Sequence, residues 1–299
     1  MNKIKTFIII LLLIVTGVYF YFQKDNWFSP AQVFVPSNGL KQGDTLLIKI
    51  KSPISEGKIT GEFDSKKVDF FQATEKTKAA ILGIDAKEKP GKHVLILNYP
   101  DDKKITKEIN ITKTDFPTTE LIVTKELQQK GYTPQKIIGN IQGKENLILK
   151  KVISVYTPEA YFSKAFISPL KEIKPVGAFG TIKKTGGSTI QHLGVDLDAK
   201  TGTEVFASND GEVSLTQELP DYGKTLIIDH GLGIYSLYLH LDKFKASEGK
   251  LVKQGDVIGL SGNTGYSIAP HLHFSIKISG ANVDPLMFIK TTQEGLTNK

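Results

Sequence analysis

The sequence predicts a mainly β protein: an immunoglobulin-like β-sandwich, then a second, mostly antiparallel β domain, behind an N-terminal transmembrane helix. Alternating apolar and polar runs recur between residues 32 and 112, glycine-punctuated strands resume after residue 173, and residues 6–22 carry no charge. With 299 residues, the chain is long enough for two domains. The expected parts are an anchor or signal at 1–30, the sandwich at 31–116, a partly helical connector at 117–170, the second domain at 171–290 and a tail at 291–299.

The uncharged run at residues 6–22 belongs in a membrane. As a helix it would be about 25 Å long, at about 1.5 Å per residue, which falls between a signal-peptide core and a full bilayer span. It ends in the aromatic run Val-Tyr-Phe-Tyr-Phe at 18–22, typical of a membrane interface. We therefore expect an uncleaved single-pass anchor in the cell membrane, with Lys3 and Lys5 in the cytoplasm and the bulk of the chain outside. The alternative is a cleaved signal peptide.

The composition narrows the chemistry. The formal net charge is +7, and all 38 basic residues are Lys. They are interleaved with acidic residues and include no Arg, so we expect no nucleic-acid partner. The absence of cysteine excludes disulfides, thiolate catalysis and cysteine zinc sites. Any metal must be held by histidine and carboxylate.

Six runs predict the strands of the sandwich, at 32–35, 45–51, 66–72, 78–84, 93–99 and 104–112. Turn residues such as Gly43, Gly57 and Gly91 separate them, and the pattern fits an immunoglobulin-like sandwich best. His93 begins an apolar strand and is expected to be structural. In the connector, a helix is predicted from 145 to 155, ended by Pro158.

Five of the six histidines lie in the second domain, and two of them form a pair. His271 and His273 are separated by one residue within an apolar run, so on a strand both imidazoles face the same side. Such a pair is typical either of a polar, solvent-exposed face or of a metal site. Further ligands are needed to favour the second interpretation.

His192 and Asp196 supply a further nitrogen and a carboxylate, four positions apart. In a straight strand their Cα atoms would be about 13 Å apart, at about 3.3 Å per residue, so both can bind one ion only if the backbone bends. Gly194 between them permits such a bend. With one member of the His271/His273 pair, they make a set of two nitrogens and one oxygen. That set leaves a tetrahedral zinc ion one open place for water.

Four segments in order carry a family resemblance. They are His-Leu-Gly-Val-Asp at 192–196, the glycine-bounded run at 202–213, Tyr-Leu-His at 238–240, and the run at 255–265 that leads to Pro-His-Leu-His-Phe at 270–274. Together they resemble the lysostaphin-type or LytM-type zinc endopeptidases, the M23 metallopeptidase family, over residues 179–289. The resemblance implies one zinc ion bound by His192, Asp196 and His273. It also implies His240 and His271 as catalytic residues, with His271 as the base and His240 steadying the oxyanion.

The chain departs from the family pattern in three places. Thr181-Ile182-Lys183 follows Phe179-Gly180, where an Arg is common, and no Tyr lies between Tyr161 and Tyr222 to assist the transition state. Ser236 stands where Thr is usual. His230 matches a common His-Gly turn and is expected to be structural.

The resemblance implies a zinc metalloendopeptidase that hydrolyses peptide cross-links of bacterial peptidoglycan. Its expected partners are the wall peptide and, through the N-terminal helix, the membrane. The family cuts both glycyl bridges and D-alanyl-diaminopimelate junctions, so the bond cleaved stays open. The alternative function is a non-catalytic M23-like protein that binds the wall or activates another hydrolase. Such relatives lack one or more of the five site residues, and here all five are present.

Overall fold

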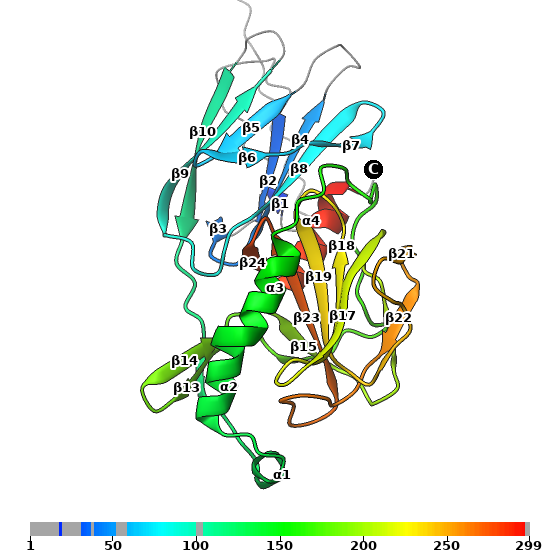
Figure 1. Ribbon diagram of the computed structural model, residues 1–299. Helices are drawn as coiled ribbons and strands as arrows, with labels where there is room; N and C mark the ends of the chain where they lie inside the picture. The colour runs from blue at the N-terminus through cyan, green and yellow to red at the C-terminus, as the bar shows by residue number, and fades with distance from the viewer. Residues whose placement is uncertain (1–17, 20–30, 37–38, 52–58, 100–103, 297–299) are drawn as a thin grey trace, which may run out of the picture.

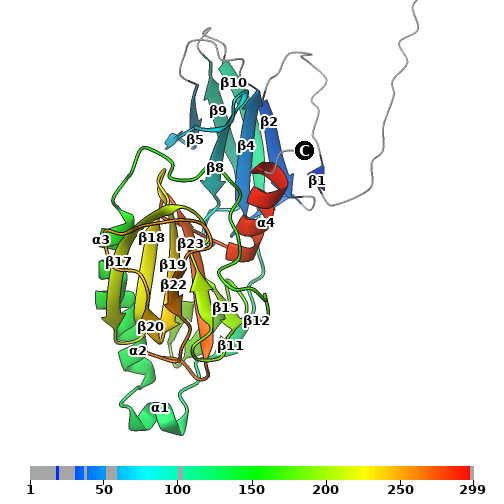
Figure 2. The same cartoon turned by 90° about the vertical axis from the view of Figure 1, so that its right-hand side faces the viewer.

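The computed structural model describes residues 18–19, 31–36, 39–51, 59–99 and 104–296, which form two β units and a helical connector (Figure 1). The N-terminal unit is blue and cyan at the top of the view, and the C-terminal unit is yellow to red below it. A second view shows helix α4, Pro285–Leu296, at the junction of the two units (Figure 2).

The N-terminal unit consists of two five-stranded sheets. One has the order β1-β2-β4-β8-β7, with bounds Val18–Tyr19, Ala31–Pro36, Thr45–Lys51, Thr77–Gly83 and Phe71–Thr74. The other has the order β3-β10-β9-β5-β6, with bounds Leu40–Lys41, Lys104–Thr112, Gly91–Asn98, Thr60–Phe63 and Lys66–Val68. Apolar side chains from both sheets, among them Ile48 and Leu97, share one buried core. The two sheets therefore pack face to face.

Most strands of this unit follow the sequence prediction. The runs at 45–51 and 104–112 are confirmed as β4 and β10 with the same bounds. The run at 66–72, predicted as one strand, is wrong, because β6 and β7 belong to different sheets and the chain crosses between them. Strands β3 and β5 were not predicted, since two and four residues carry too little alternation to be recognised.

The helix expected over residues 6–22 lies outside the described residues, except for Val18–Tyr19. These two residues form β1, which pairs antiparallel with β2. Within the described ranges, no helix combines the length and apolarity needed to cross a membrane.

The C-terminal unit is built on an eight-stranded sheet. Its path is β12-β15-β23-β19-β18-β17-β21, with β24 paired to β23; the bounds are Pro175–Gly177, Val195–Asp198, His271–Ile278, Ile234–Leu241, Gly223–Asp229, Gly211–Leu219, Leu251–Val252 and Ala281–Val283. Two three-stranded sheets accompany it: β11-β13-β14, with bounds Thr118–Glu120, Ile182–Thr185 and Ser188–Gln191, and β16-β22-β20, with bounds Glu204–Phe206, Val257–Leu260 and Lys243–Phe244.

Strand β23 divides its side chains between the two faces of the large sheet. Leu272, Phe274 and Ile276 enter the main hydrophobic core. The alternate positions, which include His271 and His273, therefore face the opposite side. On that side the connector covers strands β17 to β19, where Leu149 packs against Leu237 and its neighbours. Figure 1 shows the connector helices crossing this sheet, and the histidine pair faces the same side by alternation from Leu272 and Phe274.

The connector contains more helix than the sequence predicted. The helix expected at 145–155 is observed as α3, Asn146–Ile153. Before it come α1, Lys125–Gln129, α2, Pro134–Asn140, and a π-helical turn, Ile141–Glu145, with a kink at Gly143. Thr133 caps α2 and Pro134 occupies its first turn, both common helix-start signals.

The C-terminal segment is not a tail. Residues 291–296 continue α4, and its buried residues Phe288, Ile289, Thr292, Gly295 and Leu296 recur every three or four positions. Gly295 packs so closely on Leu47 of β4 that a Cβ there would overlap it. Strand β4 is therefore buried on both faces. Residues 297–299 lie outside the described part.

Glu145 ties the connector to the C-terminal unit. Its Oε1 accepts a hydrogen bond from the Asp221 backbone N–H at 2.8 Å, and its Oε2 accepts one from the Tyr222 N–H at 2.9 Å. Both carboxyl groups, of Glu145 and Asp221, are almost fully buried. Burial raises the pKa of Asp221 to about 7, and the charge of Glu145 acts in the same direction. Burial likewise raises the pKa of Glu145. Burial at this junction thus favours the protonated form of Asp221.

We expect the Asp221→Asn variant to gain stability relative to the unmodified protein as the pH rises from about 4 to 7. The pKa of Asp221 is higher in the folded state than the ordinary value of 3.8, so its contribution is present below pH 4 and is lost as the pH passes 7. The limiting slope is about 1.4 kcal/mol per pH unit for one proton. Urea unfolding at several pH values measures it. The exposed Asp115→Asn variant is the control, and a pH-independent difference for Asp221→Asn would contradict the prediction.

Candidate metal centre

Strands β15 and β23 place two of the predicted ligands side by side. They pair antiparallel, with Asp196 directly opposite His273, so the two side chains share one face. His192 precedes β15, and its backbone is held by hydrogen bonds to Thr181 and Gly180. The chain bends at Gly194, where a Cβ would lie within 3.0 Å of His273 and Ser275. The bend inferred from Gly194 thus leaves no room for a larger residue.

Three ligand atoms converge on one point. His192 Nε2 lies 2.9 Å from Asp196 Oδ1 and 2.9 Å from His273 Nδ1, and His273 Nδ1 lies 2.8 Å from Asp196 Oδ1. From the residues alone, either His271 or His273 could have completed the set, and His273 is the one in place.

The ring nitrogens that face away from the centre determine whether the inner nitrogens donate or accept hydrogen bonds. His192 Nδ1 donates to the Ala178 carbonyl oxygen at 2.8 Å, and His273 Nε2 lies 2.9 Å from the Ser275 hydroxyl. With these nitrogens protonated, the inner atoms of the neutral rings are lone-pair acceptors, as is the Asp196 carboxylate. Three acceptors cannot satisfy one another, whereas one divalent cation would satisfy all three. The donor set therefore fits zinc.

The charges agree with this fit. Burial opposes ionisation of Asp196, but the close contacts of its carboxylate with His192 and His273 outweigh burial and hold its pKa well below the usual range. Burial lowers the pKa of His273 to about 4, with its neighbouring histidines adding to the effect. The resting centre is thus a carboxylate beside a neutral imidazole.

His271 and His240 lie next to the three candidate ligands. His271 Nε2 is 3.5 Å from Asp196 Oδ1, and its Nδ1 donates to the Ala269 carbonyl at 2.8 Å. The ring centre of His240 is 4.8 Å from that of His271 and 6.1 Å from that of His273. All five predicted site residues are therefore gathered in one place.

His240 depends on an unusual backbone conformation. It follows Leu239, which faces the connector side, so regular alternation would point it into the core. Its φ of +60° is left-handed and breaks the alternation, with an irregular β18–β19 register nearby. Its Nδ1 then donates to the Thr264 carbonyl at 2.8 Å. The polar loop at 263–265 therefore positions this ring.

The protonation state of His240 bears on its expected role. Burial, with the neighbouring His271 and His273, lowers the pKa of His240 to about 3. The neutral ring has its proton on Nδ1 and a lone pair on Nε2. To steady an oxyanion through Nε2, His240 would need a second proton, which its surroundings oppose, so in the free protein Nε2 offers only a lone pair.

The remaining histidines lie apart from the centre. His230 is fully buried, with Nδ1 bonded to the Asp210 carbonyl and Nε2 to the Ser236 hydroxyl, and burial lowers its pKa to about 4. Both nitrogens are occupied, as expected for a structural residue. His93 lies in the N-terminal unit, bonded to Asp64 and to the Lys89 carbonyl.

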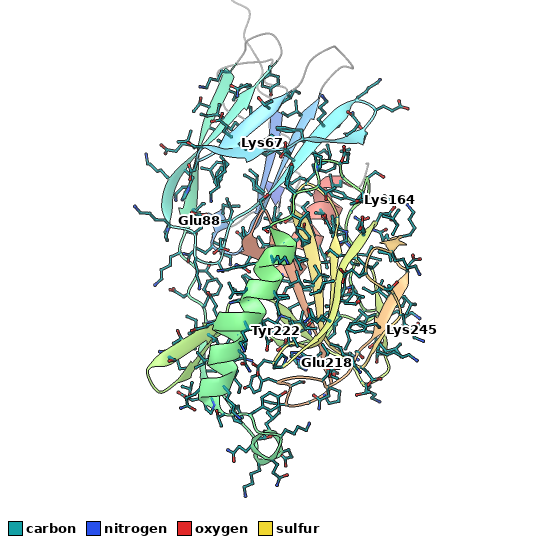
Figure 3. All side chains as sticks on the ribbon, in the orientation of Figure 1. Lys67, Glu88, Lys164, Glu218, Tyr222 and Lys245 are labelled. Atoms are coloured by element: carbon teal, nitrogen blue, oxygen red, sulfur yellow. The ribbon has the colours of Figure 1, made fainter. Side chains whose placement is uncertain are left out.

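The centre opens into a groove of about 640 Å³. Along its floor lie alternate residues of β23, from His271 to Lys277, and the connector and the β13–β14 hairpin line its sides. Gln142 of the connector donates to the Thr189 carbonyl of the hairpin at 2.9 Å. Figure 3 places Tyr222, another lining residue, beside the connector. Sequence reasoning missed Ser275 and Lys277, although continuing the alternation beyond His273 would have found both.

Two glycines should be as necessary to metal binding as the ligands. A Cβ at Gly194 would lie within 3.0 Å of His273, and one at Gly177 within 3.0 Å of Asp196. We expect Gly194→Ala and Gly177→Ala to lower the affinity for Zn²⁺ about 10- to 100-fold, because displaced supporting groups misalign ligands. Titration of chelator-treated protein with Zn²⁺ measures this. Gly187→Ala is the matched control, since its Cβ would meet nothing within 4 Å. Unchanged affinity in both site variants would contradict the prediction.

Comparison with known proteins gives one family. The model of peptidase family M23 matches residues 190–285. The Neisseria meningitidis protein named DD-carboxypeptidase/endopeptidase Mpg is 41% identical over 103 residues, 34% of this chain and 24% of the relative. The Vibrio cholerae protein named peptidoglycan DD-endopeptidase ShyA is 40% identical over 95 residues, 32% of this chain and 22% of the relative. The chain thus spans under a quarter of the length of these relatives.

A solved structure supports the fold over a longer range. It comes from Pseudomonas aeruginosa and is described as a candidate peptidase M23. It matches with a TM-score of 0.59 and 22% identity, covering 83% of this chain and 94% of that chain. Together with the gathered histidines and the family match at 190–285, these findings confirm the resemblance read from the sequence. Residues 190–285, within the C-terminal unit, match peptidase family M23.

Proposed function

We propose that this protein is a zinc-dependent endopeptidase that hydrolyses peptide cross-links of bacterial peptidoglycan. The observation that carries the proposal is the convergence of His192, Asp196 and His273 to within 2.9 Å of one another. Two relatives of the domain are named for DD-endopeptidase activity, one of them on peptidoglycan. The groove beside the centre has room for an extended peptide.

The same three residues would hold the zinc ion. When bound there, zinc would polarise a peptide carbonyl and lower the pKa of a water molecule toward neutrality. We assign the proton from that water to His271, because its Nδ1–H donates to Ala269 and leaves Nε2 as the acceptor, 3.5 Å from Asp196. We assign His240 to the same reaction as the second ring, held by Thr264.

The alternative, a non-catalytic M23-like protein that binds the wall or activates a hydrolase, has less support. Such a protein has no need of two unliganded histidines beside the ligand set. Here both are present, and each is oriented by a backbone carbonyl. The orientation of both rings by hydrogen bonds favours a catalytic role for them.

We also propose that the chain is a single-pass protein of the cell membrane, with both β units on the outer side, where the wall polymer lies. The apolar run at 6–22 and its aromatic end support an anchor. We propose further that the N-terminal unit is an immunoglobulin-like sandwich. Its two packed sheets and the parallel pairing of its short strand β3 with its last strand β10 support this.

We expect the full-length protein, loaded with one equivalent of zinc, to release peptides from purified peptidoglycan. His271→Ala and His240→Ala should slow release at least about 100-fold, as loss of a proton-transfer group does, while retaining zinc. His192→Ala and Asp196→Ala should lose both the bound zinc and the release of peptides. Metal analysis and mass spectrometry of the products measure this, with His93→Gln as the control. Loss of zinc from His271→Ala would contradict its role, and full activity in Asp196→Ala would contradict the metal centre.

The anchor can be tested separately. The full-length chain should fractionate with membranes, resist extraction by high salt and dissolve in detergent, because the uncharged apolar run would be held in lipid. A chain beginning at residue 31 should be soluble. Sequencing of the mature N-terminus is the deciding measurement, since a start downstream of residue 22 would show a cleaved signal.

A further inference from the structure

The floor of the groove extends well beyond the metal ligands. His271, His273, Ser275 and Lys277 are alternate residues of β23, and all four line the same cavity. Lys277 is four residues from His273, about 13 Å along the strand at about 3.3 Å per residue. The partner strand β19 places Tyr235 opposite Lys277 and Leu239 opposite His273. The cavity thus joins the metal centre to a lysine at the other end of the strand.

Lys277 is poorly partnered for a buried ammonium group. Its Nζ donates to Asn282 Oδ1, a neutral acceptor on the neighbouring strand β24. Asp85 is near, but its Oδ2 accepts hydrogen bonds from the backbone N–H and side-chain amide of Asn282, at 2.7 and 2.9 Å. Among the residues that the structure describes, no carboxylate forms an ion pair with Lys277 within 4.0 Å. An ammonium group can donate three hydrogen bonds, so two remain available.

The surroundings of Lys277 leave it short of negative charge. Burial lowers its pKa to about 8; the charge of Asp85 opposes this shift, and that of Lys150 on α3 adds to it. Lys87, on the loop that also carries Asp85, lines the same cavity. A buried ammonium group is costly unless an anion accompanies it. This end of the groove is therefore suited to receive an anion.

We propose that Lys277 is a substrate-recognition residue that binds a free carboxylate of an acidic peptide lying along β23. This inference rests on the proposed function, because it takes the peptide bond to be cut at the histidine cluster. From the 13 Å separation, the carboxylate belongs about four residues from that bond in an extended peptide. The opposing explanation is that Lys277 only fastens β23 to β24 through Asn282.

The test uses synthetic peptides that differ in one group. The two peptides of a pair are identical except that one carries a carboxylate where the other carries a carboxamide. Separate pairs place this group four residues from the scissile bond or adjacent to it, on either side of the bond. Affinity is measured by calorimetry and hydrolysis by product release, both with the full-length protein loaded with zinc. We expect at least about a tenfold preference for the carboxylate at the distant position on one side, as a charge-assisted hydrogen bond gives, and much less at the adjacent position.

Three variants test the residue itself. Lys277→Met should reduce the ratio between the two peptides to about one, and Lys277→Arg, which keeps the charge, should retain most of it. Lys183→Met removes a lysine from the side of the same cavity and should leave the ratio as it is. Equal affinity for the two peptides in the unmodified protein, or an unchanged ratio in Lys277→Met, would overturn the inference. Absence of hydrolysis would instead contradict the proposed function, and the affinity ratio would still decide the role of Lys277.

Discussion

The centre depends on one backbone register, the antiparallel pairing that sets Asp196 opposite His273. Because side chains alternate along a strand, a slip of one residue would leave one of the two on this face and turn the other into the hydrophobic core. The core side of β23 is filled by Leu272, Phe274 and Ile276, so such a slip would also expose apolar groups. The buried apolar residues of β23 thus fix the positions of Asp196 and His273 on the opposite face of the sheet, although they do not contact these side chains. His192 is then added by the bend at Gly194.

Much of the fold could be predicted from the sequence, because strands β4 and β10 are long enough to show their alternation. The connector was harder to predict. Its helix is broken by a π-helical turn at Gly143 and gains its stability from Leu149 packing on the sheet, a contact between residues far apart in sequence. The C-terminal segment of α4 was missed for a similar reason, since its partner Leu47 lies in the other unit.

The site shows the same division between local and distant causes. The five predicted residues could be named because each belongs to a short, recognisable motif, and the fold brings them together. The choice of His273 over His271 as ligand could not be made from the residues alone, since both face one side and only the register with Asp196 separates them. The backbone conformation of His240 and the lack of an ion-pair partner for Lys277 among the described residues could not be predicted from the sequence either. The first depends on the irregular register between β18 and β19. The second depends on Asp85, Lys150 and Lys277, which come from three segments far apart in the sequence.

The main hydrophobic core crosses from one unit to the other. It contains Leu47, Phe71 and Ile81 of the N-terminal sheets as well as Phe274 and Phe288 of the C-terminal unit. If the segment matched by the family were cut out at its ends, it would lose α4 and the strands beneath it, and apolar side chains would face water. The segment that the family model matches is therefore smaller than the part of this chain that must fold together, and it needs a surface that covers its apolar side chains.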